Sequence, residues 1–216
     1  MRNSLNKKPA IRQEPRRLKT RAALLAAGLK LLAEQSIDRV SIDDIVQHAG
    51  VAKGSFFNHF ADKGELASAI AMKIRIGVEV NIAAANRDVA DPALRVARGI
   101  STFVQFAFTQ RLAAKSFARV YTSNIGGTQP LNAGVRSDVA LGIVEKRFPL
   151  TSTEAGVVCV TGSAQGLLAS IITNNPNRDE AVALSIDVLT VLLAGFGVDP
   201  NEARYLSGAT ALSLIV

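Results

Sequence analysis

The sequence is poor in the residues that build metal sites and covalent cross-links. Its 216 residues include one cysteine, two histidines and no tryptophan. The single cysteine, Cys159, excludes an intramolecular disulfide framework and a cysteine-rich zinc module. Two histidines, His48 and His59, are too few for most histidine-ligated catalytic metal sites. We therefore expect neither a metal nor another cofactor.

The sequence also lacks the pattern of a β-sheet. No stretch alternates apolar and polar residues between turn signals, as half-buried strands do. Only seven residues are prolines, whereas alanine and leucine, which favour helices, are frequent. From residue 18 onward apolar residues recur every three or four positions, first at Leu18, Ala22, Leu25, Leu29 and Leu32. We therefore predict an all-α fold of nine to ten helices.

Acidic residues are scarce at one end of the chain. Residues 1–21 hold eight of the 25 lysines and arginines but only one, Glu14, of the 18 acidic residues, so the net charge of +7 is concentrated there. Such a basic segment commonly contacts phosphate or an anionic membrane, although the same composition also describes a solvated tail. We expect residues 1–16 to form a disordered basic arm.

No targeting or membrane segment is expected. The basic start is followed by prolines and arginines rather than by the apolar run of a secretory signal. Residues 155–177 carry no charge and are long enough to span a membrane. Because they include several glycine, serine, threonine and asparagine residues, we interpret them as a buried helix of a soluble core or interface, and the protein as cytoplasmic.

Residues 41–60 have the pattern of a helix, a tight turn and a second helix. Ser41 is a good N-cap, with Asp43 and Asp44 in the first turn, where the helix dipole favours acids. Gly50 is suited to end this helix in a left-handed conformation. A short helix at about 53–60 follows, and a helix at about 18–35 precedes the pair. Together these features predict a three-helix helix-turn-helix domain.

The second helix of such a unit lies in the major groove of DNA, with its first residues against base edges. Those residues are Lys53, Gly54 and Ser55: a long donor, a position without a side chain, and a hydroxyl. The first helix crosses the DNA backbone, so Ser41 is expected near a phosphate.

Residues 20–66 carry a characteristic set of positions: Thr20-Arg21, Ala49-Gly50-Val51, the aromatic helix from Phe56 to Phe60, Lys63 and Leu66. With this set, the segment closely resembles the DNA-binding domain of the TetR family of transcriptional regulators. Two departures are Phe57, where the family usually has tyrosine, and Ser36, where it often has glycine. The loss of the phenol removes a donor to phosphate, but the ring can still touch a thymine methyl or a sugar.

The resemblance implies a DNA-binding domain at 17–66 and an effector-binding, dimerising domain at 67–216. Alternatives remain open for single residues: Phe57 packing in the core, Asn58 simply solvated, and His59 an ordinary surface histidine. Phe56 and Phe60 are assigned to the core. The expected DNA-contacting residues are Ser41, Lys53, Gly54, Ser55, Phe57, Asn58, His59 and Lys63.

Helix-start signals continue from residue 62 onward. Asp62, Asp91-Pro92 and Asp199-Pro200 each predict a helix N-terminus, and Thr151 with Glu154 predicts a capping box. The eighth and ninth helices, at about 151–174 and 177–195, carry small and apolar residues and are the expected dimer interface. Aromatic residues that line the effector pocket or pack in the core are Phe103, Phe106, Phe117, Tyr121 and Phe148.

These observations predict a dimeric, ligand-responsive regulator, most simply a repressor, that binds a palindromic duplex operator. Few charges lie among the middle helices, so we expect a small and largely apolar effector. An architectural DNA-binding protein without an effector is the alternative. An enzyme is disfavoured, because no catalytic constellation is visible and Cys159 has no neighbouring histidine in sequence; we interpret it as a buried structural thiol.

Overall fold

The computed structural model describes residues 14–121 and 132–215. These residues form ten α-helices and a short 3-10 helix, η2, with no strand among them, so the predicted all-α fold is confirmed. The helices in chain order are α1 (Glu14–Glu34), η2 (Ile37–Arg39), α2 (Ile42–Ala49), α3 (Lys53–Phe57), α4 (Lys63–Ala85), α5 (Pro92–Thr109), α6 (Arg111–Tyr121), α7 (Ala133–Val144), α8 (Thr153–Asn174), α9 (Arg178–Gly195) and α10 (Pro200–Leu214).

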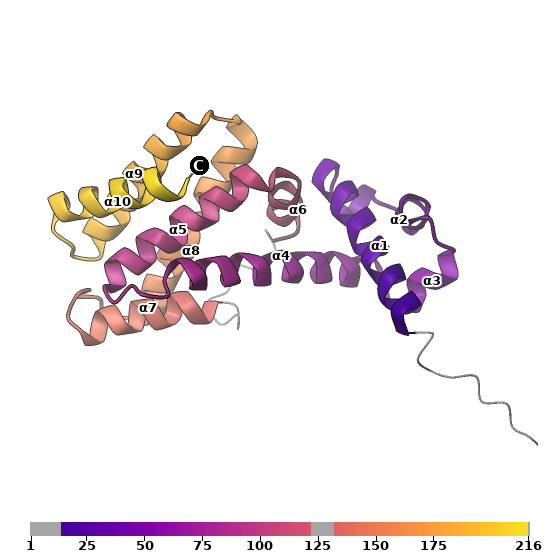
Figure 1. Cartoon of the computed structure of the whole chain (residues 1–216), viewed down its shortest axis with the longest axis horizontal. Helices are drawn as coiled ribbons and strands as arrows, with labels where there is room; N and C mark the ends of the chain where they lie inside the picture. The colour runs from indigo at the N-terminus through magenta and orange to yellow at the C-terminus, as the bar shows by residue number, and fades with distance from the viewer. Residues whose placement is uncertain (1–13, 122–131, 216) are drawn as a thin grey trace, which may run out of the picture.

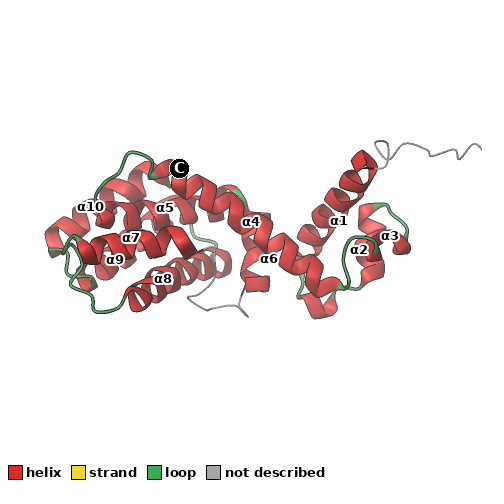
Figure 2. Cartoon of the chain, turned by 90° about the horizontal axis from the view of Figure 1, so that it is seen from below, coloured by secondary structure: helices red, strands yellow, loops and turns green. Residues whose placement is uncertain are grey.

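Two hydrophobic cores organise the chain (Figure 1). The smaller core lies among α1, α2, α3 and the start of α4, and its fully buried side chains include Leu24, Ile45, Phe56 and Leu66. The larger core lies around α5, which packs against α4 and against each helix from α6 to α10 (Figure 2). The two cores are separate clusters of buried side chains joined by continuous helix.

The long helix α4 belongs to both cores. Leu66 and Ile70 near its start are buried in the smaller core, and Val78 is buried in the larger one. Ile74, between them, packs against both. The predicted boundary between residues 66 and 67 falls inside this helix and stays a prediction.

A glycine lets α1 cross α4 closely. A Cβ atom on Gly28 would lie 2.8 Å from Cδ1 of Ile70 and 2.9 Å from Cδ2 of Leu66, closer than real Cβ atoms approach other heavy atoms. The absence of a side chain at Gly28 therefore sets how near the first helix of the smaller core comes to α4.

Most of the predicted helix starts are confirmed by hydrogen bonds. The hydroxyl of Ser41 accepts from the backbone N–H of Asp44 in a capping box, and the carboxylate of Asp62 accepts from the N–H of Glu65. Asp91 and Asp199 cap α5 and α10, each followed by proline at the first helical position. Gly50 ends α2 with a φ of 65°, in the left-handed region.

Several predicted boundaries are wrong. Ser152, not Thr151, caps α8, accepting from the N–H of Ala155. The third helix ends at Phe57 rather than near residue 60. After α7 the chain turns back tightly, with Lys146 at a φ of 58°.

The N-terminal helix is longer than the periodicity of its apolar face predicted. It begins at Glu14 instead of near residue 18, so the last three residues of the predicted arm, 14–16, are helical. An acid and a proline in a first turn both favour helix initiation. The rest of the predicted arm, residues 1–13, lies outside the described residues.

The eighth helix, which carries no charge after Glu154, is only partly covered. By length and composition α8 could cross a membrane, and 33% of its most apolar window is buried. The exposed positions follow one another at helical spacing along one face, which carries no charged side chain: Ala155, Val158, Cys159, Gly162, Gly166, Ala169 and Thr173. Cys159 is therefore exposed, and its interpretation as a buried thiol is wrong.

Candidate DNA-binding surface and interior cavity

The turn between α2 and α3 leaves the start of α3 open to solvent. Lys53 and Gly54 are exposed and Ser55 is half-buried. A Cβ atom on Gly54 would meet no other heavy atom within 4 Å, so nothing covers this position. Another molecule can approach the backbone of α3 here, as a base edge must in a helix-turn-helix complex.

Lys53 contacts an acidic neighbour in the absence of DNA. Its ammonium lies 2.9 Å from a carboxylate oxygen of Asp43, and both side chains are largely exposed. An exposed pair of this kind contributes roughly 0–1 kcal/mol, because water screens the charges. Lys53 can therefore exchange Asp43 for a phosphate or a base at little cost.

Ser41 already caps helix α2, so its predicted contact with a phosphate would have to coexist with that role. Its hydroxyl lies 2.6 Å from Oδ2 of Asp44, and the backbone N–H of Ser41 also donates to that carboxylate. These hydrogen bonds lower the pKa of Asp44. Ser41 remains at the surface, beside the start of α2.

The aromatic residues of α3 divide as the sequence indicates. Phe56 and Phe60 are buried in the smaller core, as predicted. The side chain of Phe57 is 55% exposed, with its ring edge-on to Phe56 at a centroid distance of 5.5 Å. The alternative that Phe57 packs in the core is therefore wrong. Asn58, at the end of α3, is exposed as well.

His59 lies close to the basic face of α1. Burial lowers the pKa of its imidazole, and the positive charges of Arg17 and Arg21 lower it further. The guanidinium of Arg21 also lies 5.2 Å from the centroid of the Phe60 ring. From the sequence, Arg17 was counted only in the basic segment and Arg21 also as a match to the family, and neither was expected beside His59. Their spacing of four residues, which places both on one helix face, was the available signal.

Lys63, predicted to bind phosphate, holds backbone carbonyls in this structure. Its ammonium donates to the carbonyl oxygens of Asp38 and Val40, each at 3.1 Å. The side chain is half-buried and ties the end of η2 to the start of α4. A phosphate contact would have to use its remaining hydrogen-bonding capacity, and that contact stays a prediction.

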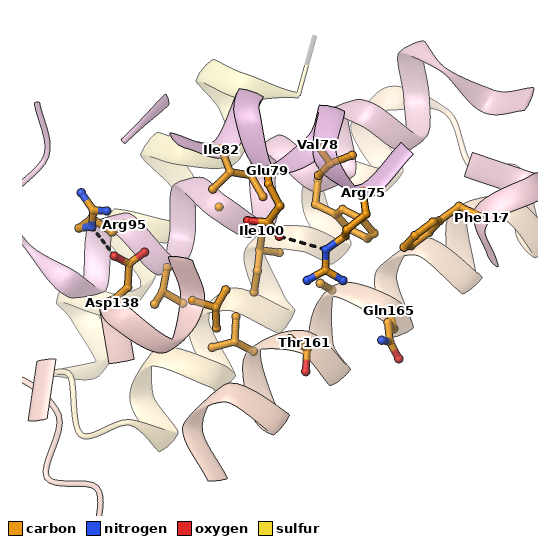
Figure 3. Close-up of a pocket in the computed structure, with 16 residues that line it drawn as sticks. Arg75, Val78, Glu79, Ile82, Arg95, Ile100, Phe117, Asp138, Thr161 and Gln165 are labelled. Atoms are coloured by element: carbon orange, nitrogen blue, oxygen red, sulfur yellow. Dashed lines mark hydrogen bonds and ion pairs between the residues drawn. The ribbon is translucent and has the colours of Figure 1, made fainter. Parts of the chain in front are cut away.

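A cavity of about 60 Å³ lies inside the larger helical bundle (Figure 3). Helix α4 forms one wall, and helices α5, α6, α7 and α8 form the others. Ten of its lining residues are apolar or glycine: Val78, Ile82, Val96, Gly99, Ile100, Phe103, Phe117, Val135, Val160 and Ala164.

Only some of the aromatic residues proposed for the pocket reach this cavity. Phe103 and Phe117 line it. Phe106 lines a separate groove between α1, α4 and α5. Phe148 instead packs in the core, 5.2 Å from Phe196 between ring centroids and directly over Gly142. Tyr121 is the last residue of α6, and its side chain lies outside the described residues.

The cavity also contains charged side chains that sequence reasoning did not place there. Nε of Arg75 lies 3.0 Å from Oε1 of Glu79, and Nε of Arg95 lies 2.6 Å from Oδ1 of Asp138. Burial raises the pKa of Glu79 and of Asp138, although the arginine beside each opposes the rise. The sequence-based view that few charges lie among the middle helices is therefore incomplete for this cavity, because α4, α5 and α7 contribute two ion pairs.

No metal centre accompanies these groups in the part of the chain that the structure describes: no three histidine, cysteine, aspartate or glutamate side chains gather in a way that could hold an ion. The acids of the cavity are each engaged by an arginine instead.

The geometry of α1 to α3 defines a helix-turn-helix protein whose larger helical bundle encloses a cavity. The family described as bacterial regulatory proteins, tetR family, matches residues 24–70, which span the smaller core and the start of α4. The helix-turn-helix region of this chain is thus similar in sequence to that of the TetR family of regulators.

Relatives by sequence match the same region. An uncharacterized HTH-type transcriptional regulator, YvdT of Bacillus subtilis, is 42% identical over 48 residues, which are 22% of this chain and 25% of the relative. The transcriptional regulator AcuR of Cereibacter sphaeroides is 35% identical over 71 residues, which are 29% of this chain and 32% of the relative. The match thus covers less than a third of the length of either relative.

Similarity of fold extends over nearly the whole chain. The crystal structure of RolR in complex with the ligand resorcinol aligns with a TM-score of 0.60 and 23% sequence identity, covering 90% of this chain and 95% of that one. At this level of identity, the likeness concerns the fold of both the helix-turn-helix region and the larger bundle.

Proposed function

We propose that the protein is a cytoplasmic, dimeric transcriptional repressor that binds a palindromic operator through α3 and releases it when a small effector enters the cavity. One observation carries the proposal: α4 is a single helix that belongs to the smaller core and also lines the cavity. Ile70, in the smaller core, is only five residues before Arg75, in the cavity wall. A ligand that displaces Arg75 or Glu79 therefore acts on the helix that carries the DNA-binding unit.

A second helix links the same two regions. Phe117 of α6 lines the cavity, and two residues later Nη1 of Arg119 donates to the carbonyl oxygen of Leu32 in α1, at 3.2 Å. Val120 packs against the smaller core. A ligand that moves Phe117 would move this hydrogen bond as well, so α4 and α6 both connect the cavity to the helix-turn-helix unit.

The DNA-binding part of the proposal is supported by the open start of α3 and the basic groups beside it. Lys53, Gly54 and Ser55 are positioned for base edges, whereas Arg17 and Arg21 of α1 are suited to phosphate. A dimer places two such helices in successive major grooves, so the half-sites should lie about 34–36 Å, one helical turn, or a multiple of it apart.

The dimer part is supported by the uncovered face of α8 together with the exposed side of α9. On α9, Leu184 and Val191 are exposed, and Val191 lines a groove together with Ala155 and Cys159 of that face. Glycine and alanine permit close helix approach, and a symmetric pair of such faces is self-complementary. A second copy of the chain would cover the apolar residues that the monomer leaves in water.

The effector part is supported by the cavity and by the fold shared with RolR, whose structure holds resorcinol. The alternative of an architectural DNA-binding protein predicts a filled interior, which the cavity argues against.

A reciprocal titration tests the switch. DNA affinity is measured with and without a cavity ligand, and ligand affinity with and without operator DNA. Linkage requires the same factor in both directions, typically about 5–150-fold. A ligand that occupies the cavity and leaves DNA affinity unchanged would refute release by effector. Binding of a single half-site by a monomer would refute the palindromic dimer.

A further inference from the structure

The two ion pairs make the cavity electrically balanced. Arg75 and Arg95 face Glu79 and Asp138, so two positive and two negative groups share a space otherwise lined by apolar side chains (Figure 3). A ligand with a net charge would lose its hydration without gaining an unmatched counter-charge, which is costly in an apolar surrounding. The balance therefore favours a neutral ligand.

The carboxylates of Glu79 and Asp138 can accept further hydrogen bonds. Oε1 of Glu79 and Oδ1 of Asp138 accept from their arginines. Their second oxygens, Oε2 and Oδ2, have no hydrogen-bond partner within the described residues, although an ionised carboxylate has about four acceptor sites. A ligand that donates two hydrogen bonds can satisfy both.

A hydroxyl group fits these positions better than an ammonium, an ether or a carboxylate. Nε and Nη2 of a guanidinium lie on one edge, and in Arg95 this edge faces Asp138. Nη1 of Arg95 donates to the carbonyls of Asn86 and Val89, whereas Nη2 has no partner in the described part of the chain. A hydroxyl can donate to Asp138 and accept from Nη2 at once. An ammonium cannot accept, and an ether or carboxylate cannot donate.

The size of the cavity limits the ligand to a small molecule. One water-sized group occupies about 10–15 Å³ on this scale, so a cavity of about 60 Å³ holds only about four to six such groups. A ring with two hydroxyl groups has a few more non-hydrogen atoms than that, so it fits only if it displaces side chains of the wall. Ile100, Phe103 and Phe117 offer an apolar wall to the body of the ligand.

We propose that the cavity binds a small neutral molecule, no larger than a single ring, that bears two hydroxyl groups. One hydroxyl donates to Glu79 and the other to Asp138, and the apolar body lies against Ile100, Phe103 and Phe117. The proposal rests on the proposed function only in taking this cavity as the effector site.

The test uses calorimetry on the full-length protein without DNA. The probes are the three positional isomers of benzenediol, their dimethyl ethers, benzoate and benzylammonium. We expect at least one diol to bind with a Kd below about 1 mM, roughly tenfold or more tighter than its ether, the anion or the cation. Equal or tighter binding of an ether, benzoate or benzylammonium, or no binding of any diol, would overturn the proposal.

Variants connect binding to the two carboxylates. Glu79→Gln and Asp138→Asn should each weaken diol binding by about tenfold or more. The matched control is Glu154→Gln, because Glu154 pairs with Arg136 at 2.7 Å and does not line the cavity; it should bind like the unaltered protein. Unchanged diol binding in Glu79→Gln would contradict the proposal. If circular dichroism shows that Asp138→Asn does not fold, binding of the probe ligands by Glu79→Gln and by the unaltered protein still tests the proposal.

Operator binding, measured separately, distinguishes the two proposals. A protein that binds operator DNA as a dimer but ignores every diol retains its proposed function and loses this ligand class. A protein that binds a diol through Glu79 and Asp138 without any change in DNA affinity retains the ligand class and loses the proposed switch.

Discussion

The helix-turn-helix region and the larger bundle place their functional side chains in opposite ways. In the first, Lys53, Gly54 and Phe57 project from the surface around a small core. In the second, Arg75 and Asp138 point inward and are buried. A surface that binds a large, charged polymer needs exposed donors, whereas a site for a small molecule must surround its ligand. The two regions thus show how one chain separates recognition of DNA from recognition of a ligand.

The two regions should differ most in the stability of their cores, which we expect to unfold separately. Phe56→Ala should cost the smaller core about 3–5 kcal/mol and abolish DNA binding, because a fully buried ring is replaced by a cavity. Phe148→Ala should cost the larger core a similar amount and destroy the effector site. Hydrogen exchange in each region, monitored during thermal unfolding, measures the loss of stability of both cores. Equal loss of protection in both regions of either variant would show that the cores unfold as one unit.

The smaller core was predicted well because its signals are local. The capping box of Ser41, the left-handed Gly50 and the four-residue spacing of Phe56 and Phe60 each depend on a few neighbouring residues. These features fix both the fold of the unit and which end of α3 is open. The hydrogen bond from Lys63 to the carbonyl oxygen of Asp38, 25 residues away, has no such local signal.

The cavity could not be predicted in the same way, because five helices converge on it. Arg95 and Asp138 are 43 residues apart, and only packing brings them to 2.6 Å. The positions of aromatic residues were a poor guide to the cavity for a related reason. Phe148 and Phe117 cannot be told apart by residue type, but Phe148 packs in the core over Gly142. Helix starts in this region were predicted correctly where proline and aspartate marked them, as at Asp91 and Asp199.

The exposed face of α8 and α9 allows the larger bundle to be tested as the dimerising region. Val191→Glu places a charge in the proposed interface and should weaken dimerisation by roughly 3–5 kcal/mol, because a buried unpaired charge is strongly unfavourable. The side chain of Val191 is 74% exposed in the monomer. Val144, 77% exposed near the end of α7, provides the control, and Val144→Glu should leave the dimer intact. Sedimentation equilibrium distinguishes the two, and a dimer that tolerates Val191→Glu would place the interface elsewhere.

Within the DNA-binding region, two groups of side chains should have different effects. Lys53→Ala and Ser55→Ala should reduce discrimination between operator and random DNA by about 1–3 kcal/mol, as expected for base contacts. Arg17→Ala and Arg21→Ala should instead weaken binding to all sequences. Each arginine that neutralises a phosphate contributes about 1 to the slope of log affinity against log salt, so its removal should reduce the slope by that amount. Affinities at several salt concentrations measure both quantities. A change in specificity from the α1 variants would mean that these arginines read bases.

The smallest expected effect concerns protons on the DNA-binding face. Burial and the charges of Arg17 and Arg21 lower the pKa of His59, so protonation of its imidazole is disfavoured in the free protein. The unfolded chain then binds more protons than the folded one between the lowered pKa and about 6.5, and stability falls as pH drops through that window. A phosphate against His59 would do the reverse, raising the pKa and taking up a proton on binding. We therefore expect operator affinity to rise modestly as pH falls from about 7.5 to about 5.5.

The test of this proton uptake is an affinity profile across that range, alongside an NMR titration of the free protein. His59→Gln should flatten the part of the profile that depends on His59, while leaving helix content unchanged. Arg17→Ala and Arg21→Ala should raise the pKa of His59 in the free protein, because each removes a positive charge that disfavours the imidazolium. A profile that keeps its slope in His59→Gln would assign the proton to another group. It would also remove His59 from the phosphate-binding set, leaving its burial against α1 as its contribution to the fold.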